Sequence, residues 1–221
     1  MNYFPNLIEE LRNCPCCGSD EFLPWGYKEN QRGYRSVECC DCDLIYIQNR
    51  LNPEGLYQYY YNYIGAVHQS SEELNAMREK MYELEYKLIH KYLPVESQVL
   101  DVGCSGGYFL DWFYRHGHHV EGVKFGSLAA AEAAKKYHIH IGNFPEINFS
   151  KHYDLVVFRG VIEHVGYPKD YLDKARSVLK KGGKFILLPL QMVRASALKF
   201  IKICGVSIYL KNTCSTYNPS I

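Results

Sequence analysis

The stretch from Val99 to Leu110, VLDVGCSGGYFL, places a strand, a glycine-rich turn and a helix in direct succession. Apolar and β-branched residues before the turn predict a buried strand, and the aromatic-rich residues after it predict an amphipathic helix. Gly103, Gly106 and Gly107 would let the backbone pass close to a ligand, where a Cβ atom would clash. Because the first amides of a helix attract negative charge, the turn predicts a cradle for a nucleotide or a sulfonium amino acid.

The spacing of the glycines separates these two ligands. Dinucleotide enzymes carry G-x-G-x-x-G, but Ser105 takes the second glycine position and the pattern here is G-x-x-G-G. Asp101 stands two residues before Gly103 at the predicted strand end, where dinucleotide enzymes require no acid. The turn therefore favours the sulfonium ligand.

Strands alternate with helices through residues 70–221, which we expect to form one domain. After the glycine turn, the predicted elements are a strand at 118–125, a helix at 127–137, strands at 139–144 and 153–160, a helix at 167–183 and a strand at 184–190. Such alternation predicts a doubly wound α/β fold, with a parallel sheet between helices. Ligands of such sheets bind beyond the carboxyl ends of the strands.

A long helix is predicted before the glycine turn. Ser70 and Glu73 have the spacing of an N-terminal capping box, and Pro94 predicts the end of the helix. An apolar stripe at helical spacing is expected to pack on the core: Leu74, Met77, Met81, Leu84 and Leu88.

Six of the nine cysteines form two groups near the N-terminus. Two C-x-x-C pairs are able to supply four thiolates to one tetrahedral Zn²⁺; the pairs are Cys14 with Cys17 and Cys39 with Cys42. Residues 1–50 are therefore predicted to be a zinc ribbon, with short strands at 33–39 and 44–48. Four thiolates leave no open coordination position, so the zinc is expected to be structural.

The ligand register is ambiguous, because Cys16 and Cys40 create C-x-C pairs as well. The set Cys14, Cys17, Cys39 and Cys42 is preferred, because both of its C-x-x-C pairs are followed by the same type of turn. Gly18 follows one pair and Asp43 follows the other, and both residue types tolerate positive φ. The alternative is buried or redox-active cysteines without a metal.

Residues 51–69 include the tyrosine-rich segment LYQYYYNYIG and are expected to connect the two modules. One interpretation is that the tyrosines pack between the modules. The other is that their hydroxyls line an acceptor site.

A formal net charge of +1 and sparse basic residues in the ribbon argue against nucleic acid as a partner. The N-terminus lacks the apolar run of a signal peptide, and no window is long and apolar enough to span a membrane. We therefore expect a cytoplasmic protein with no membrane partner, and the sequence leaves the oligomeric state open.

The ordered set of motifs resembles the class I S-adenosylmethionine-dependent methyltransferases that carry an N-terminal zinc ribbon. VLDVGCSGGYFL resembles their first motif, and residues 153–190 resemble their fourth strand, a Glu-His signature, a helix, a Gly-Gly pair and the fifth strand. The resemblance covers residues 14 to about 190. It implies a Rossmann-like fold, S-adenosylmethionine as cofactor and a small polar acceptor such as a sugar or polysaccharide precursor.

The resemblance also implies roles for single residues. Asp101 and the turn would line the methionine and ribose part of the cofactor, and the pair after the third strand would lie near the adenine. The candidate cofactor residues are Asp101, Gly103, Cys104, Gly107, Lys124, Asn143, Phe144 and Arg159. Glu163 and His164 would face the acceptor. His164 is the candidate catalytic base, and the alternative is that it caps or packs at a helix start.

Lys124 departs from the family pattern, because it stands where these enzymes have an acid that accepts both ribose hydroxyls. Glu121 lies three residues earlier and is expected on the opposite face of the strand. Residues 196–210 are expected to form one apolar helix or strand, where the family has about two more strands. A degenerate methyltransferase fold that serves as a binding or scaffold protein is therefore an alternative, and a zinc-ribbon nucleic-acid adaptor is another.

Overall fold

The computed structural model describes residues 5–26, 33–61, 72–188, 201–203 and 206–208. The chain divides into two units. The larger comprises residues 1–8 and 51–190, and the smaller comprises residues 9–50 and 191–221. Each unit contains its own sheet.

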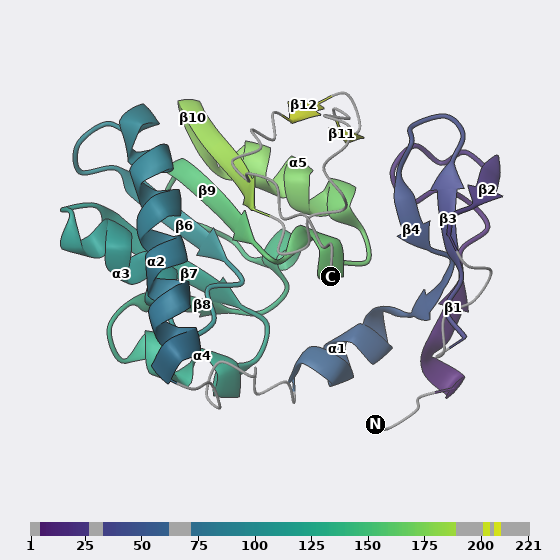
Figure 1. The fold of residues 1–221 in the computed structure, drawn as a ribbon, viewed down its shortest axis with the longest axis horizontal. Helices are drawn as coiled ribbons and strands as arrows, with labels where there is room; N and C mark the ends of the chain where they lie inside the picture. Colours follow the sequence, from purple (N-terminus) through teal and green to yellow (C-terminus); the bar gives the residue numbers. More distant parts are fainter. Residues whose placement is uncertain (1–4, 27–32, 62–71, 189–200, 204–205, 209–221) are drawn as a thin grey trace, which may run out of the picture. The chain divides into compact units, whose positions relative to one another are not determined.

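The larger unit is built around a five-stranded parallel sheet. Its strands are β6 (Gln98–Val102), β7 (His119–Lys124), β8 (His138–Ile141), β9 (Tyr153–Arg159) and β10 (Leu179–Leu188). They lie in the order β10-β9-β6-β7-β8 (Figure 1). The chain thus starts in the middle, moves out to one edge and returns to fill the other, which confirms the predicted doubly wound, Rossmann-like fold.

Helices cover both faces of this sheet. They are α2 (Glu72–Ile89), α3 (Tyr108–Arg115), α4 (Ser127–Ala134) and α5 (Pro168–Val178). Val157 packs in a cluster with Phe109 of α3, whereas the ring of the next residue, Phe158, faces Tyr171 of α5. Because successive strand residues point to opposite faces, α3 and α5 lie on opposite sides of the sheet. Short 3₁₀ turns lie in the connections of this sheet: η3 (His90–Tyr92), η4 (Phe144–Glu146) and η5 (Ile162–His164).

The face of α2 that packs on the core differs from the predicted one. Met77, Leu84 and Leu88 are 54%, 52% and 50% exposed, whereas Tyr82 and Tyr86 are at most 9% exposed. Both stripes have helical spacing, and the rings of Tyr82 and Tyr86 pack against the aromatic rings of Phe109 and Phe113 in α3. The predicted apolar stripe was therefore wrong at these described positions. Ser70 of the expected capping box lies outside the described residues.

Part of the expected connector is a helix, α1 (Pro53–Tyr61). The Asn52 side-chain oxygen accepts a hydrogen bond from the Gly55 amide at 2.8 Å, and Pro53 is the first helical residue. An N-cap asparagine followed by proline is a helix-start signal that the sequence analysis overlooked.

The smaller unit contains the antiparallel sheet β2-β3-β4, formed by Phe22–Pro24, Ser36–Cys39 and Ile45–Ile47. The second and third of these strands were predicted, and β2 was not. A further pair joins β1 (Ile8–Glu10) to β5 (Asn49–Leu51), after the 3₁₀ turn η1 (Pro5–Leu7).

Near the C-terminus, β11 (Ile201–Ile203) and β12 (Val206–Ile208) pair antiparallel, which replaces the single apolar segment expected there. Among the helices that the structure describes, none has both the length and the apolar character needed to cross a bilayer.

Candidate functional site

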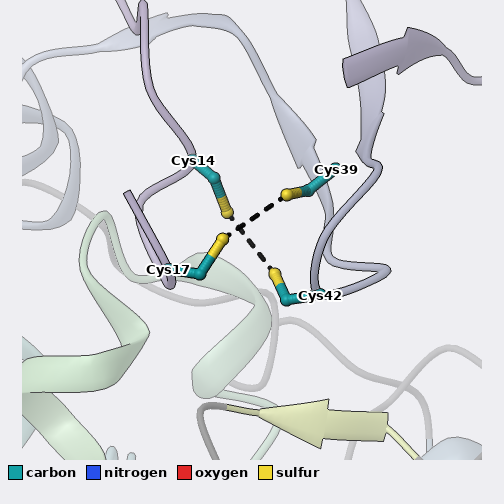
Figure 2. A group of neighbouring side chains, drawn as sticks. All are labelled: Cys14, Cys17, Cys39 and Cys42. Carbon is teal, nitrogen blue, oxygen red and sulfur yellow. Dashed lines mark hydrogen bonds between the residues drawn. The ribbon is translucent and has the colours of Figure 1, made fainter. Parts of the chain in front are cut away.

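Four cysteine side chains converge in the smaller unit (Figure 2). The Sγ atoms of Cys14, Cys17, Cys39 and Cys42 all lie within 4.8 Å of one another. Cys14 Sγ is 3.6 Å from Cys42 Sγ, and Cys17 Sγ is 3.5 Å from Cys39 Sγ. Four thiolates at about 2.3 Å from a central zinc ion lie about 3.8 Å apart. The cluster therefore has the size of a tetrahedral zinc site after small adjustments.

Two matching turns bring these sulfurs together. The Gly18 amide donates to the Cys14 carbonyl at 3.0 Å, and the Asp43 amide donates to the Cys39 carbonyl at 3.1 Å. Both residues have the expected positive φ, 81° for Gly18 and 59° for Asp43. The repeated turn explains why this register converges, while Cys40 is exposed outside the cluster.

Thiol acidity differs within the cluster. Burial raises the pKa of Cys39, but hydrogen bonds from the backbone amides of Asp41 and Cys42 outweigh it and lower that pKa to about 7. Burial raises the pKa of Cys14 above its usual range. Metal binding would therefore release protons, as it does at other thiolate sites.

A second constellation lies at the carboxyl edge of the larger sheet, where the loops after β6 and β9 meet. The Gly103 amide donates to the Val123 carbonyl of β7 at 2.8 Å. A Cβ atom at Gly103 would collide with Cγ2 of Val161, so the glycine is required by the neighbouring loop as well as by its φ of 84°. Ser105 and Gly107 also have positive φ. Such alternating backbone conformations expose amides in the manner of anion-binding nests.

Asp101 is a buried charged residue of this edge, and Lys124 nearby is half-buried. Asp101 is 3% exposed, and its Oδ1 has no hydrogen-bond partner among the described residues. Burial raises the pKa of Asp101 to about 7, although Arg159 and Lys124 oppose the rise electrostatically. Burial lowers the pKa of Lys124, which Cys104 and Asp101 partly offset. A buried carboxyl oxygen without a partner is costly unless a ligand satisfies it.

Cys104 and Phe144 have buried side chains. Cys104 is 5% exposed and packs with Leu110 and Ala133, in space left by the missing side chain of Gly122. Phe144 is 1% exposed, and its ring contacts Phe149, Phe158 and Tyr171. A ligand at this edge would therefore meet their backbones instead of their side chains.

Arg159 and Asn143 have side chains that are paired within the protein. Arg159 Nε lies 2.7 Å from Glu85 Oε2 of α2, and its guanidinium lies 4.5 Å from the Tyr82 ring centroid. Asn143 donates to Glu146 at 2.8 Å and accepts from the Tyr171 hydroxyl at 2.7 Å. These pairings hold the loops after β8 and β9 in place.

Helix α1 brings tyrosines to the same edge. The Tyr60 ring centroid lies 6.3 Å from that of the exposed His164, and the Tyr57 ring lies 5.4 Å from that of Phe125. Phe125 directly follows Lys124 and was not singled out from the sequence. An aromatic residue at the end of a predicted strand, beside the ligand edge, was the available signal.

Glu121 lies on the face of β7 opposite to that of Lys124, as expected from the alternation of strand residues. It accepts hydrogen bonds from His140 and from Tyr153 and does not join the Asp101 group.

Comparison with known proteins identifies a family match over residues 74–203, to a family described as a methyltransferase domain. A ubiquinone biosynthesis O-methyltransferase of Pectobacterium carotovorum is 25% identical over 141 residues, which are 52% of this chain and 59% of that relative. The enzyme of the same name from Bradyrhizobium sp. is 32% identical over 97 residues, which are 41% and 38% of the two chains. The chain spans about half the length of the curated relatives it matches.

Among solved structures, the chain is similar to the amino pentose methyltransferase CalS10 from Micromonospora echinaspora. That protein is 20% identical, with coverage of 56% of this chain and 58% of that chain and a TM-score of 0.48. The family match spans more than half of the chain, and the observed sheet is doubly wound, as the family resemblance implied. The chain therefore belongs to the methyltransferase domain family, in its class I, Rossmann-like form.

Proposed function

We propose that the protein transfers a methyl group from S-adenosylmethionine to a small polar acceptor. The observation that carries the proposal is the unpartnered, buried Oδ1 of Asp101 beside the glycine turn. It provides an acceptor for a cationic group at the edge where doubly wound sheets bind ligands. Names of the curated relatives specify O-methyl transfer, and a sugar or polysaccharide precursor is a suitable hydroxyl acceptor.

The residues at this edge fit the cofactor's chemical groups. Asp101 would accept from the ammonium of the methionine part, and the amides of the turn at 103–107 would bind its carboxylate. The Lys124 side chain would lie by the ribose, and the backbone of Asn143 and Phe144 by the adenine. When bound, the cofactor supplies a methyl group on a positively charged sulfur, which an acceptor attacks in line.

The protein's own contribution is positioning, exclusion of water and proton transfer. Tyr57, Tyr60 and Phe125 would form the wall of the acceptor site. A hydroxyl acceptor loses a proton as it is methylated, and the exposed imidazole of His164 would take it. The alternative is that His164 has only a packing role, against the ring of Tyr60.

Calorimetry with S-adenosylmethionine tests the proposal. A bound ammonium should ionise Asp101, so binding near pH 7 should release protons and the apparent enthalpy should depend on the buffer. Asp101→Asn should weaken binding and abolish the proton release, whereas Asp170→Asn, at an exposed position of α5, should change neither. Proton release that persists in Asp101→Asn would contradict the assignment.

A degenerate methyltransferase fold that acts as a binding protein is the second candidate. Lys124 in place of the expected acid favours it, as does the pairing of Arg159 with Glu85. Absence of heat at millimolar S-adenosylmethionine, with a well-folded protein, would support this candidate against the first.

For the smaller unit, we propose one structural zinc ion held by Cys14, Cys17, Cys39 and Cys42. Thiols stay reduced and available to a metal in the cytosol, so we propose that the protein is cytoplasmic.

A further inference from the structure

Glu121, His138 and His140 form a second cluster of potential metal ligands, in the larger unit. One ligand atom from each residue lies within 4.8 Å of the other two. Glu121 pairs with His138 across β7 and β8, and His140 follows two residues later on the same face of β8. The two imidazole centroids are 4.5 Å apart. The register of two neighbouring strands therefore brings these three side chains together.

The two oxygens of the Glu121 carboxylate have different partners. Oε2 accepts from His140 Nε2 at 2.9 Å and from the buried Tyr153 hydroxyl at 2.6 Å. Oε1 forms an ion pair with Lys151 Nζ at 2.5 Å. Oε2 is therefore the oxygen that faces the histidines. A hydroxyl that donates to a ligating carboxylate fixes its orientation, as second-shell groups do at established metal sites.

Only small movements would convert this cluster into a coordination shell. Ligand atoms at about 2.0–2.2 Å from a tetrahedral zinc ion lie about 3.4 Å apart. His140 Nε2 already lies 2.9 Å from Glu121 Oε2. His138 is exposed, so the core does not restrict the movement of its ring. Lys151 opposes a cation, but its side chain is 43% exposed and its ammonium can move into solvent.

We propose that Glu121, His138 and His140 bind a divalent transition metal ion such as Zn²⁺ or Co²⁺, with solvent in the remaining position. Two imidazoles and a carboxylate are a donor set that zinc accepts in proteins. The ion would link the edge strand β8 to β7 and thereby restrain residues 142–144, which follow β8 directly. The proposal is independent of the methyltransferase assignment and of the thiol cluster.

Titration of the whole chain with Co²⁺ tests the proposal, after one equivalent of Zn²⁺ has filled the thiol site and unbound Zn²⁺ has been removed. We expect one further Co²⁺ ion to bind, with weak visible absorption and without the intense thiolate-to-metal bands of cobalt bound to cysteine. His138→Gln and Glu121→Gln should each lower the Co²⁺ affinity at least about tenfold, because loss of a direct ligand costs no less than loss of a second-shell partner.

His152→Gln is the matched control, since His152 is exposed, lies outside the cluster and should leave the affinity unchanged. His138 is exposed as well, so its replacement should preserve the thermal midpoint of the metal-free chain. Failure of the wild-type chain to bind Co²⁺ beyond the thiol site would overturn the proposal. Equal affinity in the wild type and His138→Gln would overturn it too, because the ion would then lie elsewhere.

Discussion

Arg159, at the end of β9, is bound to Glu85 of α2 through a 2.7 Å contact between Nε and Oε2. The two side chains are 13% and 21% exposed, so the ion pair is largely shielded from water. The same guanidinium lies over Tyr82, one of the tyrosines that α2 buries. Arg159 therefore joins α2 to the ligand edge of the sheet. It would affect a bound cofactor indirectly, by holding the residues of that edge in position.

Glu85→Gln should lower the free energy of unfolding by about 2–3 kcal/mol, because it leaves a shielded arginine charge without its counter-ion. Urea denaturation measures this loss. Glu79→Gln is the control, since the Arg115–Glu79 pair is about half exposed and should contribute less than about 1 kcal/mol. Equal effects of the two substitutions would contradict the shielded anchor.

Asp101 should make the larger unit less stable as the pH rises. Its pKa is raised from 3.8 to about 7 in the folded protein, mainly by burial. The folded state therefore binds the proton more tightly, and this stabilisation is complete below pH 3.8 and lost as the pH rises through 7. Each pKa unit corresponds to about 1.4 kcal/mol, so the loss is of the order of a few kcal/mol.

Asp101→Asn keeps a neutral side chain at every pH and should remove this loss. The variant should be more stable than the wild type at pH 8, and that advantage should shrink as the pH falls to 5, as measured by urea denaturation of the metal-loaded chain. A stability difference that does not change with pH would contradict the raised pKa.

Gly103→Ala should lower the stability of the fold more than Gly117→Ala, although both glycines have left-handed backbones. Both Gly103 and Gly117 have positive φ, 84° and 82°, and strain at such positions costs about 1–3 kcal/mol. At Gly117 nothing lies within 4 Å of the added Cβ, whereas at Gly103 it meets Val161. Thermal unfolding should therefore show a larger loss for Gly103→Ala.

Val161→Ala removes the Cγ2 atom that the new Cβ would meet. Added to Gly103→Ala, it should restore the part of stability lost to the collision but not the part lost to backbone strain. Simple additivity of the two single effects would show that the loops after β6 and β9 do not contact each other as described.

Sequence patterns predicted the alternation of strands and helices and the cysteine register because both depend on local signals. The apolar run at residues 153–158 is a local signal for a buried strand, and Gly18 and Asp43 mark their turns locally. The buried face of α2 was not predictable in this way, since two stripes had the same period and the aromatic rings of α3 decided between them. The Arg159–Glu85 pair joins residues far apart in the chain, and no local pattern announces such a pair.

Cys39→Ser should abolish zinc binding by the smaller unit, while the helical circular dichroism of the larger unit is retained. Metal analysis of the purified chain measures the zinc, with wild type expected to retain one ion through dialysis. Cys40→Ser is the control, because Cys40 is exposed and lies outside the cluster. Wild-type protein without zinc, and with all four thiols freely titratable, would contradict the site.

Lys124→Glu should raise the affinity for S-adenosylmethionine, provided that the ribose lies at the end of β7. A carboxylate there accepts hydrogen bonds from two hydroxyls, and hydrogen bonds to a charged group contribute about 1.5–3 kcal/mol, which corresponds to about tenfold or more in affinity. In the free protein the new acid would lie near Asp101 and raise its pKa further, so calorimetry should be done at pH 8 or above. Lys124→Gln removes the cation without adding a carboxylate and should give no comparable gain. If both variants gain equally, loss of the lysine explains the effect. If Lys124→Glu is well folded and binds S-adenosylmethionine no better than the wild type, the loss of an acid does not explain Lys124. The pocket would then be adapted to a different ligand that uses the lysine.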